Sequence, residues 1–227
     1  MIKIENVEVM GWEAAIRGMR NPMNSWDKSD SRWENVPIDI TKEDLKGTTR
    51  MFFLGDNDYD LALKLAKGGS VHAKYRRMIT VYCDILAPLY WWKEFETYRV
   101  GVTPNPTDIE MNSCSTMHKI HAKDFSIEDF SNEHLTTDSL LKLHDLIDHL
   151  NFYRRLYIRT NEKGDWWQMI QLLPSSYNQR RTVELNYEVL SNIYRHRKAH
   201  KLVEWQVFCE WIKMLPYSKI ITLEEDN

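Results

Sequence analysis

The stretch "RRMITVYCDILAPLYWWKEFETYR", residues 76–99, decides the fold, because a strand pattern changes there into a helix pattern. From Ile79 to Ile85 every second residue is apolar and the residues between them are polar or aromatic, which is the period of a half-buried strand. Pro88 then suits the first turn of a helix, and aromatic residues give that helix a large apolar surface. The sequence therefore predicts a strand that leads directly into a short helix.

Outside this stretch the chain alternates between clear and weak signals. Residues 2–9 alternate like a strand, and helix patterns follow at 11–20, 56–69, 136–157, 166–174, 185–200 and 201–216. Residues 21–44 are rich in Asn, Asp, Ser and Pro, so we expect mostly irregular chain there, with Trp26 and Trp33 as anchors to the body. A second loop is predicted at 101–112, which contains two prolines.

Helices outnumber strands, and the expected fold class is α+β: a helix-dominated domain with a small antiparallel sheet. At 227 residues, 43% of them hydrophobic, the chain can bury a core of its own. The sequence has no internal repeat and no low-complexity segment. We therefore expect residues 1–227 to form a single domain.

Composition restricts the partners and the compartment. Lys and Arg number 30 against 33 Asp and Glu, a net charge of −3, so no global field attracts nucleic acid or an anionic membrane. The three cysteines are widely spaced without a paired motif, which indicates reduced thiols in a cytoplasmic protein. The first ten residues lack the apolar core of a signal peptide, and no apolar run is long enough to span a bilayer. The expected partner is a small molecule.

The segment "NIYRHRKAH", residues 192–200, concentrates cationic and imidazole side chains. His196 and His200 are four residues apart, the spacing of a zinc pair on a helix, but neither a zincin glutamate nor a cysteine pair accompanies them. Two interpretations stay open: a solvated helix end, or an anion site that uses Arg195 or Arg197.

Other motifs are weaker. "HKIH" at residues 118–121 also lacks further metal ligands, so we predict no metal site. Cys114 lies in a polar segment and is more often a bystander than a nucleophile. No Gly-rich phosphate loop occurs, which argues against the common dinucleotide and P-loop sites. The residues alone indicate an α+β domain with a candidate anion site.

Two segments resemble the family of flavin-dependent thymidylate synthases. In "HAKYRRMITVYCDILAPLYWWKEFETYRVG", residues 72–101, a strand passes through Ala-Pro into an aromatic helix, as it does ahead of that family's Arg-His-Arg signature. In "LLPSSYNQRRTVELNYEVLSNIYRHRKAH", residues 172–200, a Leu-Pro pair, two asparagines and an arginine follow in the family's spacing. Fainter similarity at residues 9–20 and 65–72 extends the match over most of the chain. The resemblance implies the fold of that family.

The resemblance also implies roles for individual residues. Asn186 and Asn192 match residues that contact the flavin, and Arg197 matches an arginine at the nucleotide site. A carboxamide offers a donor and an acceptor to the flavin edges, and a guanidinium can hold a phosphate or a pyrimidine oxygen. The implied site comprises Arg197 and Ser115 for catalysis, His72, Tyr98, Arg99, Asn186 and Asn192 for the cofactor, and Glu94, Arg99, Ser115 and Arg197 for the substrate.

The chain departs from the family pattern where the substrate would bind. Of the Arg-His-Arg signature only Arg99 is present, and a longer loop separates it from Ser115. Glu94 stands where the family has Gln, and a carboxylate repels a phosphate dianion. We expect looser phosphate binding unless Lys93, Arg180, Arg181 or an arginine of another subunit compensates.

The implied activity is that of a flavin-dependent thymidylate synthase: reductive methylation of dUMP to dTMP with FAD, methylenetetrahydrofolate and NADPH. The flavin supplies the redox step, so the lack of a convincing enzyme nucleophile is compatible with this chemistry. The resemblance also implies a homotetramer. We expect the helices at 87–99 and 186–197 near subunit contacts, because aromatic residues on short helices would otherwise face water. Two alternatives stay open: a flavoprotein of the same fold that modifies another pyrimidine nucleotide, and a non-catalytic binding or structural protein.

Overall fold

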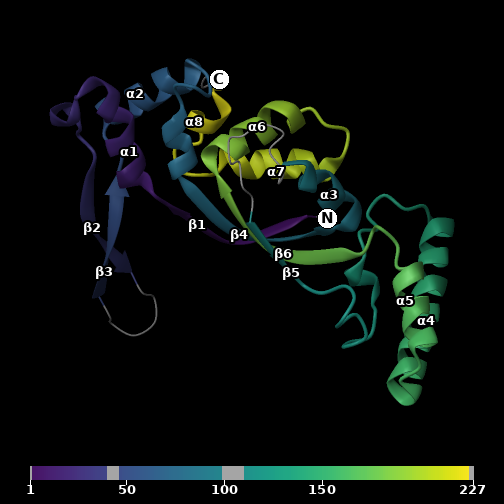
Figure 1. The fold of residues 1–227 in the computed structure, drawn as a ribbon. Helices are drawn as coiled ribbons and strands as arrows, with labels where there is room; N and C mark the ends of the chain where they lie inside the picture. The colour runs from purple at the N-terminus through teal and green to yellow at the C-terminus, as the bar shows by residue number, and fades with distance from the viewer. Residues whose placement is uncertain (1, 40–45, 99–109, 225–227) are drawn as a thin grey trace. The chain divides into compact units, whose positions relative to one another are not determined.

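The computed structural model describes residues 2–39, 46–98 and 110–224 (Figure 1). The chain forms two compact units, each assembled from segments distant in sequence. Unit 1 contains the segment up to Val7, Tyr82–Glu184 and Leu202–Val207, and unit 2 contains Glu8–Val81, Leu185–Lys201 and the chain from Phe208 on. The expectation that residues 1–227 form a single domain stays a prediction.

A small sheet has the strand order β1-β4-β6-β5 (Figure 1). Its strands are β1 (Lys3–Met10), β4 (Thr80–Pro88), β5 (Glu110–Ser113) and β6 (Asn178–Asn186). β5 pairs antiparallel with β6, with Met111 opposite Val183. The predicted fold class, a helix-dominated α+β fold with a small antiparallel sheet, is confirmed.

The strand and the helix predicted around Pro88 are both present. In β4 every second side chain from Val81 to Ala87 is buried, so the alternation in the sequence follows the burial. α3 (Leu89–Phe95) begins directly after Pro88, and the 3₁₀ helix η4 (Glu96–Tyr98) continues it. Pro88 itself is the N-cap, with an extended backbone, so it lies one position ahead of the first turn in which we expected it.

The aromatic residues of α3 form a core of unit 1. Trp91, Trp92 and Phe95 are fully buried, and the rings of Trp91 and Phe95 stack with their centroids 4.9 Å apart. Trp205, near the start of α7 (Val203–Lys213), adds a ring 4.9 Å from that of Trp91. These rings are already buried within one chain, so the reason that we gave for a subunit contact at α3, aromatic residues facing water, does not hold. The contact itself stays a prediction.

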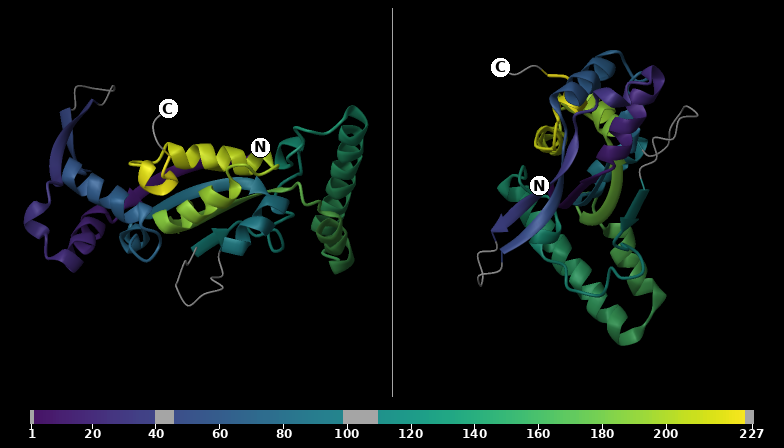
Figure 2. Two further views of the ribbon diagram at one scale, coloured as in Figure 1. Left: turned by 90° about the horizontal axis from the view of Figure 1, so that it is seen from above. Right: turned by 90° about the vertical axis from the view of Figure 1, so that its left-hand side faces the viewer.

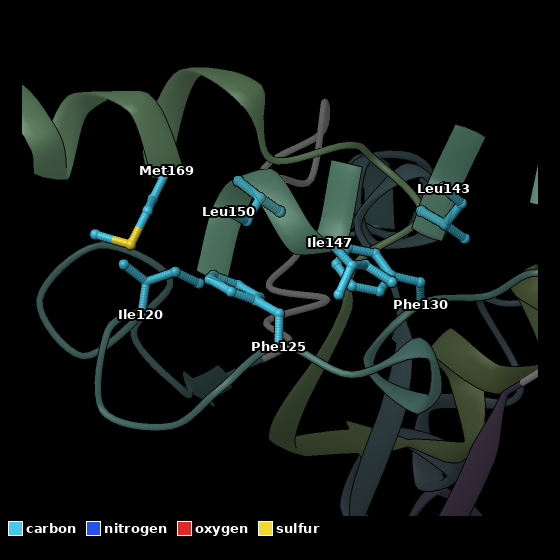
Figure 3. Packing of buried hydrophobic residues seen from close by; sticks show 7 residues of the cluster. All are labelled: Ile120, Phe125, Phe130, Leu143, Ile147, Leu150 and Met169. Carbon is cyan, nitrogen blue, oxygen red and sulfur yellow. The ribbon is translucent and has the colours of Figure 1, made fainter. Parts of the chain in front are cut away.

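A second core of unit 1 lies under two antiparallel helices, α4 (Thr137–Thr160) and α5 (Lys163–Leu172), which lie side by side in every view (Figures 1 and 2). Thr136 caps α4 by accepting a hydrogen bond from the backbone N–H of Ser139, and Asn161 ends it in the left-handed conformation. The buried side chains of the helices meet those of the preceding segment, which includes η5 (Ile127–Asp129): Ile120, Phe125, Phe130, Leu143, Ile147, Leu150 and Met169 (Figure 3). The predicted long helix is confirmed.

Apart from strand ends and the second half of α7, which it shares with unit 1, unit 2 consists of short helices and one hairpin. Its elements are α1 (Trp12–Arg20), η1 (Asn21–Met23), η2 (Trp26–Lys28), β2 (Arg32–Asp39), β3 (Lys46–Phe53), α2 (Asp56–Lys67), η3 (Lys74–Met78), α6 (Tyr187–Arg197) and α8 (Lys219–Thr222). The helices predicted at 11–20, 56–69 and 185–200 are therefore present, the last of them shortened at both ends.

The β2–β3 hairpin corrects the expectation of irregular chain at residues 21–44. The two strands pair antiparallel, with Trp33 opposite Phe52 and their rings 5.3 Å apart. Cross-strand packing of this kind stabilises a strand whose own sequence is rich in turn-forming residues. Trp33 is also an anchor as expected, since its Nε1 donates a hydrogen bond to Glu13 on α1 at 2.9 Å.

Candidate functional site

The predicted site residues divide between the two units. Glu94, Tyr98 and Ser115 belong to unit 1, and His72, Asn186, Asn192 and Arg197 belong to unit 2. Arg99 lies outside the residues that the structure describes. The geometry of each set is therefore known within its own unit.

In unit 1, Glu94 and Tyr98 meet at the same indole. The Nε1 group of Trp205 donates a hydrogen bond to a carboxylate oxygen of Glu94 at 3.0 Å. The Tyr98 ring packs edge-on against Trp205, with centroids 5.9 Å apart. The carboxylate of Glu94 thus has a fixed donor, which holds it beside the buried aromatic core.

Ser115 lies in an exposed turn after β5. Its hydroxyl oxygen accepts hydrogen bonds from the backbone N–H groups of Met117 at 3.3 Å and His118 at 2.8 Å. The preceding residue, Cys114, is fixed to β6 because its N–H donates to the carbonyl of Arg180 at 3.0 Å. With its oxygen occupied as an acceptor, the hydroxyl of Ser115 keeps its proton available for an anion or a carbonyl.

Sequence reasoning missed the network around Arg181 that links η4 to this turn. The guanidinium lies 4.4 Å from the ring centroid of Trp92, donates to the side chain of Gln179 at 3.0 Å, and forms an ion pair with Glu96. Gln179 in turn donates to the carbonyl of Cys114 at 2.7 Å. The charge of Arg181 is therefore neutralised, and the residue organises the turn of Ser115 instead of supplying a spare cation.

Arg180 does not supply a spare cation either. Its guanidinium forms an ion pair with Glu5 at 3.0 Å and lies 3.8 Å from Asp84. Asp84 also accepts hydrogen bonds from Thr182 at 2.6 Å and Asn6 at 2.8 Å, and these bonds lower its pKa. The predicted contribution of Arg180 or Arg181 to phosphate binding would require these pairs to open.

In unit 2, three of the predicted residues lie on or beside α6. Asn186 caps the helix, because its side-chain oxygen accepts hydrogen bonds from the N–H groups of Glu188 and Val189 at 3.1 and 3.0 Å. The side-chain oxygen of Asn192 accepts a hydrogen bond from Arg195 at 3.0 Å. Arg197 is half-buried in the last turn of the helix. Within the described chain, the Nδ2 groups of both asparagines have no acceptor.

The surroundings of α6 include a buried ion pair that gave no sequence signal. Arg76 on η3 donates to Glu188 at 2.7 Å, to the hydroxyl of Ser191 and to the carbonyl of Ile220, both at 3.1 Å. Both charged side chains are about 95% buried. The pair fixes the first turn of α6. His72 lies in an exposed turn ahead of η3, where its backbone N–H donates to the carbonyl of Gly69 at 3.0 Å.

Thiol and metal chemistry find little support in the described parts of the chain. Burial raises the pKa of the Cys83 and Cys209 thiols to about 12, so neither ionises near neutral pH. Cys114 is exposed. Among the described residues, no group of three or more His, Cys, Asp or Glu side chains is arranged to hold a metal ion. Over the same ranges, no helix has the length and apolar character that crossing a membrane requires.

Neither a protein-family model nor a curated protein matches the sequence. Solved structures do match the fold. The structure of ThyX from Helicobacter pylori with FAD and dUMP has a TM-score of 0.64 and 15% identity, covering 98% of each chain. Another complex of that protein with FAD and dUMP gives a TM-score of 0.60 over 96% of this chain and 98% of that one, also at 15% identity.

A third match is to a different enzyme. PolB from Streptomyces cacaoi, a UMP/dUMP methylase bound with 5-Br dUMP, has a TM-score of 0.58 and 14% identity, covering 98% of this chain and 95% of that one. These matches extend over nearly the whole length of all the chains compared. At such low identity they establish one property of this protein, which is a ThyX-like fold.

Proposed function

We propose that this protein is a flavin-dependent enzyme that methylates dUMP to dTMP with FAD and a folate one-carbon donor. The observation that carries the proposal is the match of fold along 98% of the chain to a ThyX protein solved with FAD and dUMP. Asn186, Asn192 and Arg197 support it, because they stand at the spacing of that family's flavin and nucleotide contacts. NADPH as reductant, a homotetrameric assembly and a cytoplasmic location belong to the same proposal.

The donors present on α6 fit a flavin. Asn186 and Asn192 use their oxygens within the helix, and their Nδ2 groups would donate to the carbonyl and nitrogen edge of the ring system. Arg197 would hold the acceptor nucleotide by charge-assisted hydrogen bonds, with a further donor from Ser115. FAD, when bound, supplies the redox chemistry, and the protein supplies orientation and electrostatics.

The second candidate acceptor is another pyrimidine nucleotide. PolB, which matches this fold about as well as ThyX does, is a UMP/dUMP methylase. In addition, Glu94 holds a carboxylate against the indole of Trp205, at a position where the family that the sequence resembles has a neutral amide. A carboxylate disfavours a phosphate dianion and can accept N–H donors, so it changes which pyrimidine or which phosphate binds well.

Three measurements on the purified protein test the proposed function. FAD binding is measured by absorbance and calorimetry, product formation by chromatography with dUMP or UMP, methylenetetrahydrofolate and NADPH, and activity in cells by rescue of a thymidine-requiring strain. We expect FAD binding, dTMP formation and rescue. If the protein binds FAD and forms a product from UMP but none from dUMP, the second candidate acceptor, another pyrimidine nucleotide, would be favoured. A folded protein that binds no FAD would overturn the enzymatic proposal and leave a binding or structural role.

Asn192→Ala is expected to weaken FAD binding about fivefold, because losing one hydrogen bond typically costs about 1 kcal/mol. Asn192→Asp should weaken it at least as much, since the aspartate keeps the acceptor toward Arg195 and removes the Nδ2 donor. Calorimetric titration with FAD measures both variants, and circular dichroism checks that α6 is retained. Unchanged affinity in Asn192→Asp would show that the donor does not face the flavin.

Arg197→Ala is expected to weaken dUMP binding tenfold or more and to leave FAD affinity nearly unchanged. Losing a charge-assisted hydrogen bond typically costs about 1.5–3 kcal/mol. Arg195→Ala is the matched control, because Arg195 is exposed on the same helix and its substitution removes the same charge. Equal weakening of dUMP binding by both substitutions would indicate a general field effect. Equal loss of FAD and dUMP in Arg197→Ala would place Arg197 in a structural role.

A further inference from the structure

A cavity of about 310 Å³ lies in unit 2, and none of the predicted flavin or nucleotide residues lines it. Its walls come from α1, η2, the segment that leads into β2, and β3. α1 and the β2–β3 hairpin lie next to each other in Figure 1. This volume falls at the lower end of the range for small-molecule pockets. The cavity therefore has room for a compact ligand.

A buried ion pair behind one wall of the cavity fixes which hydrogen-bond donors and acceptors that wall presents. Arg20 is only 4% exposed, and it donates to Asp58 at 2.5 Å and to the carbonyl of Ser25 at 3.3 Å. Its second terminal nitrogen has no acceptor within the described chain. Ser29 and Ser31 donate their hydroxyl protons to Asp58 at 2.7 and 2.6 Å. Toward the cavity these serines can therefore offer only oxygen lone pairs.

Arg17 adds an exposed cation one turn earlier on the same face of α1. It forms no ion pair or hydrogen bond with any residue that the structure describes. Glu13, a further turn away, lines the same cavity, and Trp33 fixes its carboxylate at 2.9 Å. The cavity lining thus includes two arginines one turn apart on α1 and acceptor oxygens at other points of its wall.

Aromatic side chains complete the lining. Trp26 is about half exposed, and its indole is held by a hydrogen bond to Asn21 at 2.8 Å. Phe52, half-buried on β3, packs beside Trp33 and also borders the cavity. Such rings bind planar ligands by stacking or edge contacts. The apolar part of the lining therefore suits a flat ring.

We propose that this cavity is a second ligand site, which binds a nucleoside monophosphate. Arg17 would hold the phosphate by an ion pair. The remaining terminal nitrogen of Arg20, whose charge Asp58 already neutralises, would add a directed hydrogen bond. The base would lie against Trp26 and Phe52. Its N–H groups would donate to the oxygens of Ser29, Ser31 and Glu13, which can only accept. A ligand that combines an anion with a ring bearing N–H donors satisfies all of these groups together.

The test uses the full-length protein titrated with AMP, GMP, CMP and UMP, with inorganic phosphate as the probe for a bare anion. Binding is followed by calorimetry. We expect at least one nucleotide to bind more tightly than phosphate and to lose affinity tenfold or more in Arg17→Ala. Trp26→Ala should weaken the binding of the nucleotide and leave the binding of phosphate unchanged. Arg17 and Trp26 are exposed, so both variants should fold.

Two control variants separate this site from the acceptor site proposed above. Arg155→Ala removes an exposed arginine of α4 in unit 1 and should leave binding unchanged. With the purine nucleotides AMP and GMP, for which no other site is proposed, Arg197→Ala should also leave binding unchanged. Nucleotide binding that is lost in Arg197→Ala and kept in Arg17→Ala would overturn the second site, whereas the reverse pattern supports it even if the proposed enzymatic function fails. Phosphate that binds as tightly as every nucleotide, or no binding at millimolar concentration, would also overturn it.

Discussion

Asp58→Asn is expected to lower the free energy of unfolding by about 3–5 kcal/mol, the usual cost of removing one partner from a buried ion pair. Asp58 is fully buried, and its two oxygens accept hydrogen bonds from Arg20, Ser29 and Ser31, as well as from backbone N–H groups. An amide brings an N–H group into a place where only donors converge. It also leaves the guanidinium of Arg20 buried without a countercharge.

The measurement is equilibrium unfolding in urea, followed by tryptophan fluorescence. Asp56→Asn is the matched control, because Asp56 is an exposed aspartate in the first turn of the same helix, α2. Its loss should cost less than about 1 kcal/mol, the size of an interaction with the helix dipole. Similar losses in the two variants would show that the Asp58 cluster contributes no special stability.

The same cluster predicts a dependence of stability on pH. Burial alone would raise the pKa of Asp58, but hydrogen bonds from Ser31, Ser29 and Arg20 outweigh it and hold the pKa below its ordinary value of 3.8. A carboxyl whose pKa is lower in the folded state stabilises the fold above the unfolded value, and this contribution is lost as the pH falls through the folded value. The protein should therefore lose stability on acidification below about pH 4, and Asp58→Asn should lose less over that range.

Local signals in the sequence were sufficient for some elements and misleading for others. β4 and α3 were predictable because alternation and Pro88 act over a few residues. β6 was not predictable in this way, although Gln179, Val183 and Leu185 are buried at alternate positions along it. Arg181 stands in the same alternation, and its charge hides the strand pattern in the sequence. In the structure its guanidinium covers the ring of Trp92, so a charged residue takes the place of an apolar one.

In the candidate site, too, local sequence signals predict some features and miss others. Asn186 was assigned from the family's spacing, and its local role as the cap of α6 could have been predicted from its position before a helix pattern. The ion pairs Arg20–Asp58 and Arg76–Glu188 join residues 38 and 112 positions apart. No pattern in a single sequence connects such distant charges. Each of them separately looks like an ordinary polar residue on the surface of a helix.

Arg76→Met is expected to destabilise the protein by about 3–5 kcal/mol, because it leaves Glu188 buried without its countercharge. Glu188→Leu should cost a similar amount by leaving Arg76 unpaired. The cost should be high here, since both side chains are about 95% buried and Arg76 also bonds to Ser191 and to the carbonyl of Ile220. Denaturant unfolding of the single and double variants gives the coupling free energy between the two positions.

The double variant Arg76→Met, Glu188→Leu decides how this pair acts. Two apolar side chains of similar size leave no buried charge, so the double variant should be more stable than either single one, with a coupling of several kcal/mol. The same cycle on Lys142 and Asp138, an exposed pair on α4 with 2.6 Å between nitrogen and oxygen, should give about 0.3–0.5 kcal/mol. Additive losses at Arg76 and Glu188 would contradict the ion pair. The backbone N–H of Glu188 donates to the Asn186 cap, so loss of the ion pair should disorder the start of α6. If the FAD binding proposed above needs only an ordered α6, the double variant should recover it together with stability.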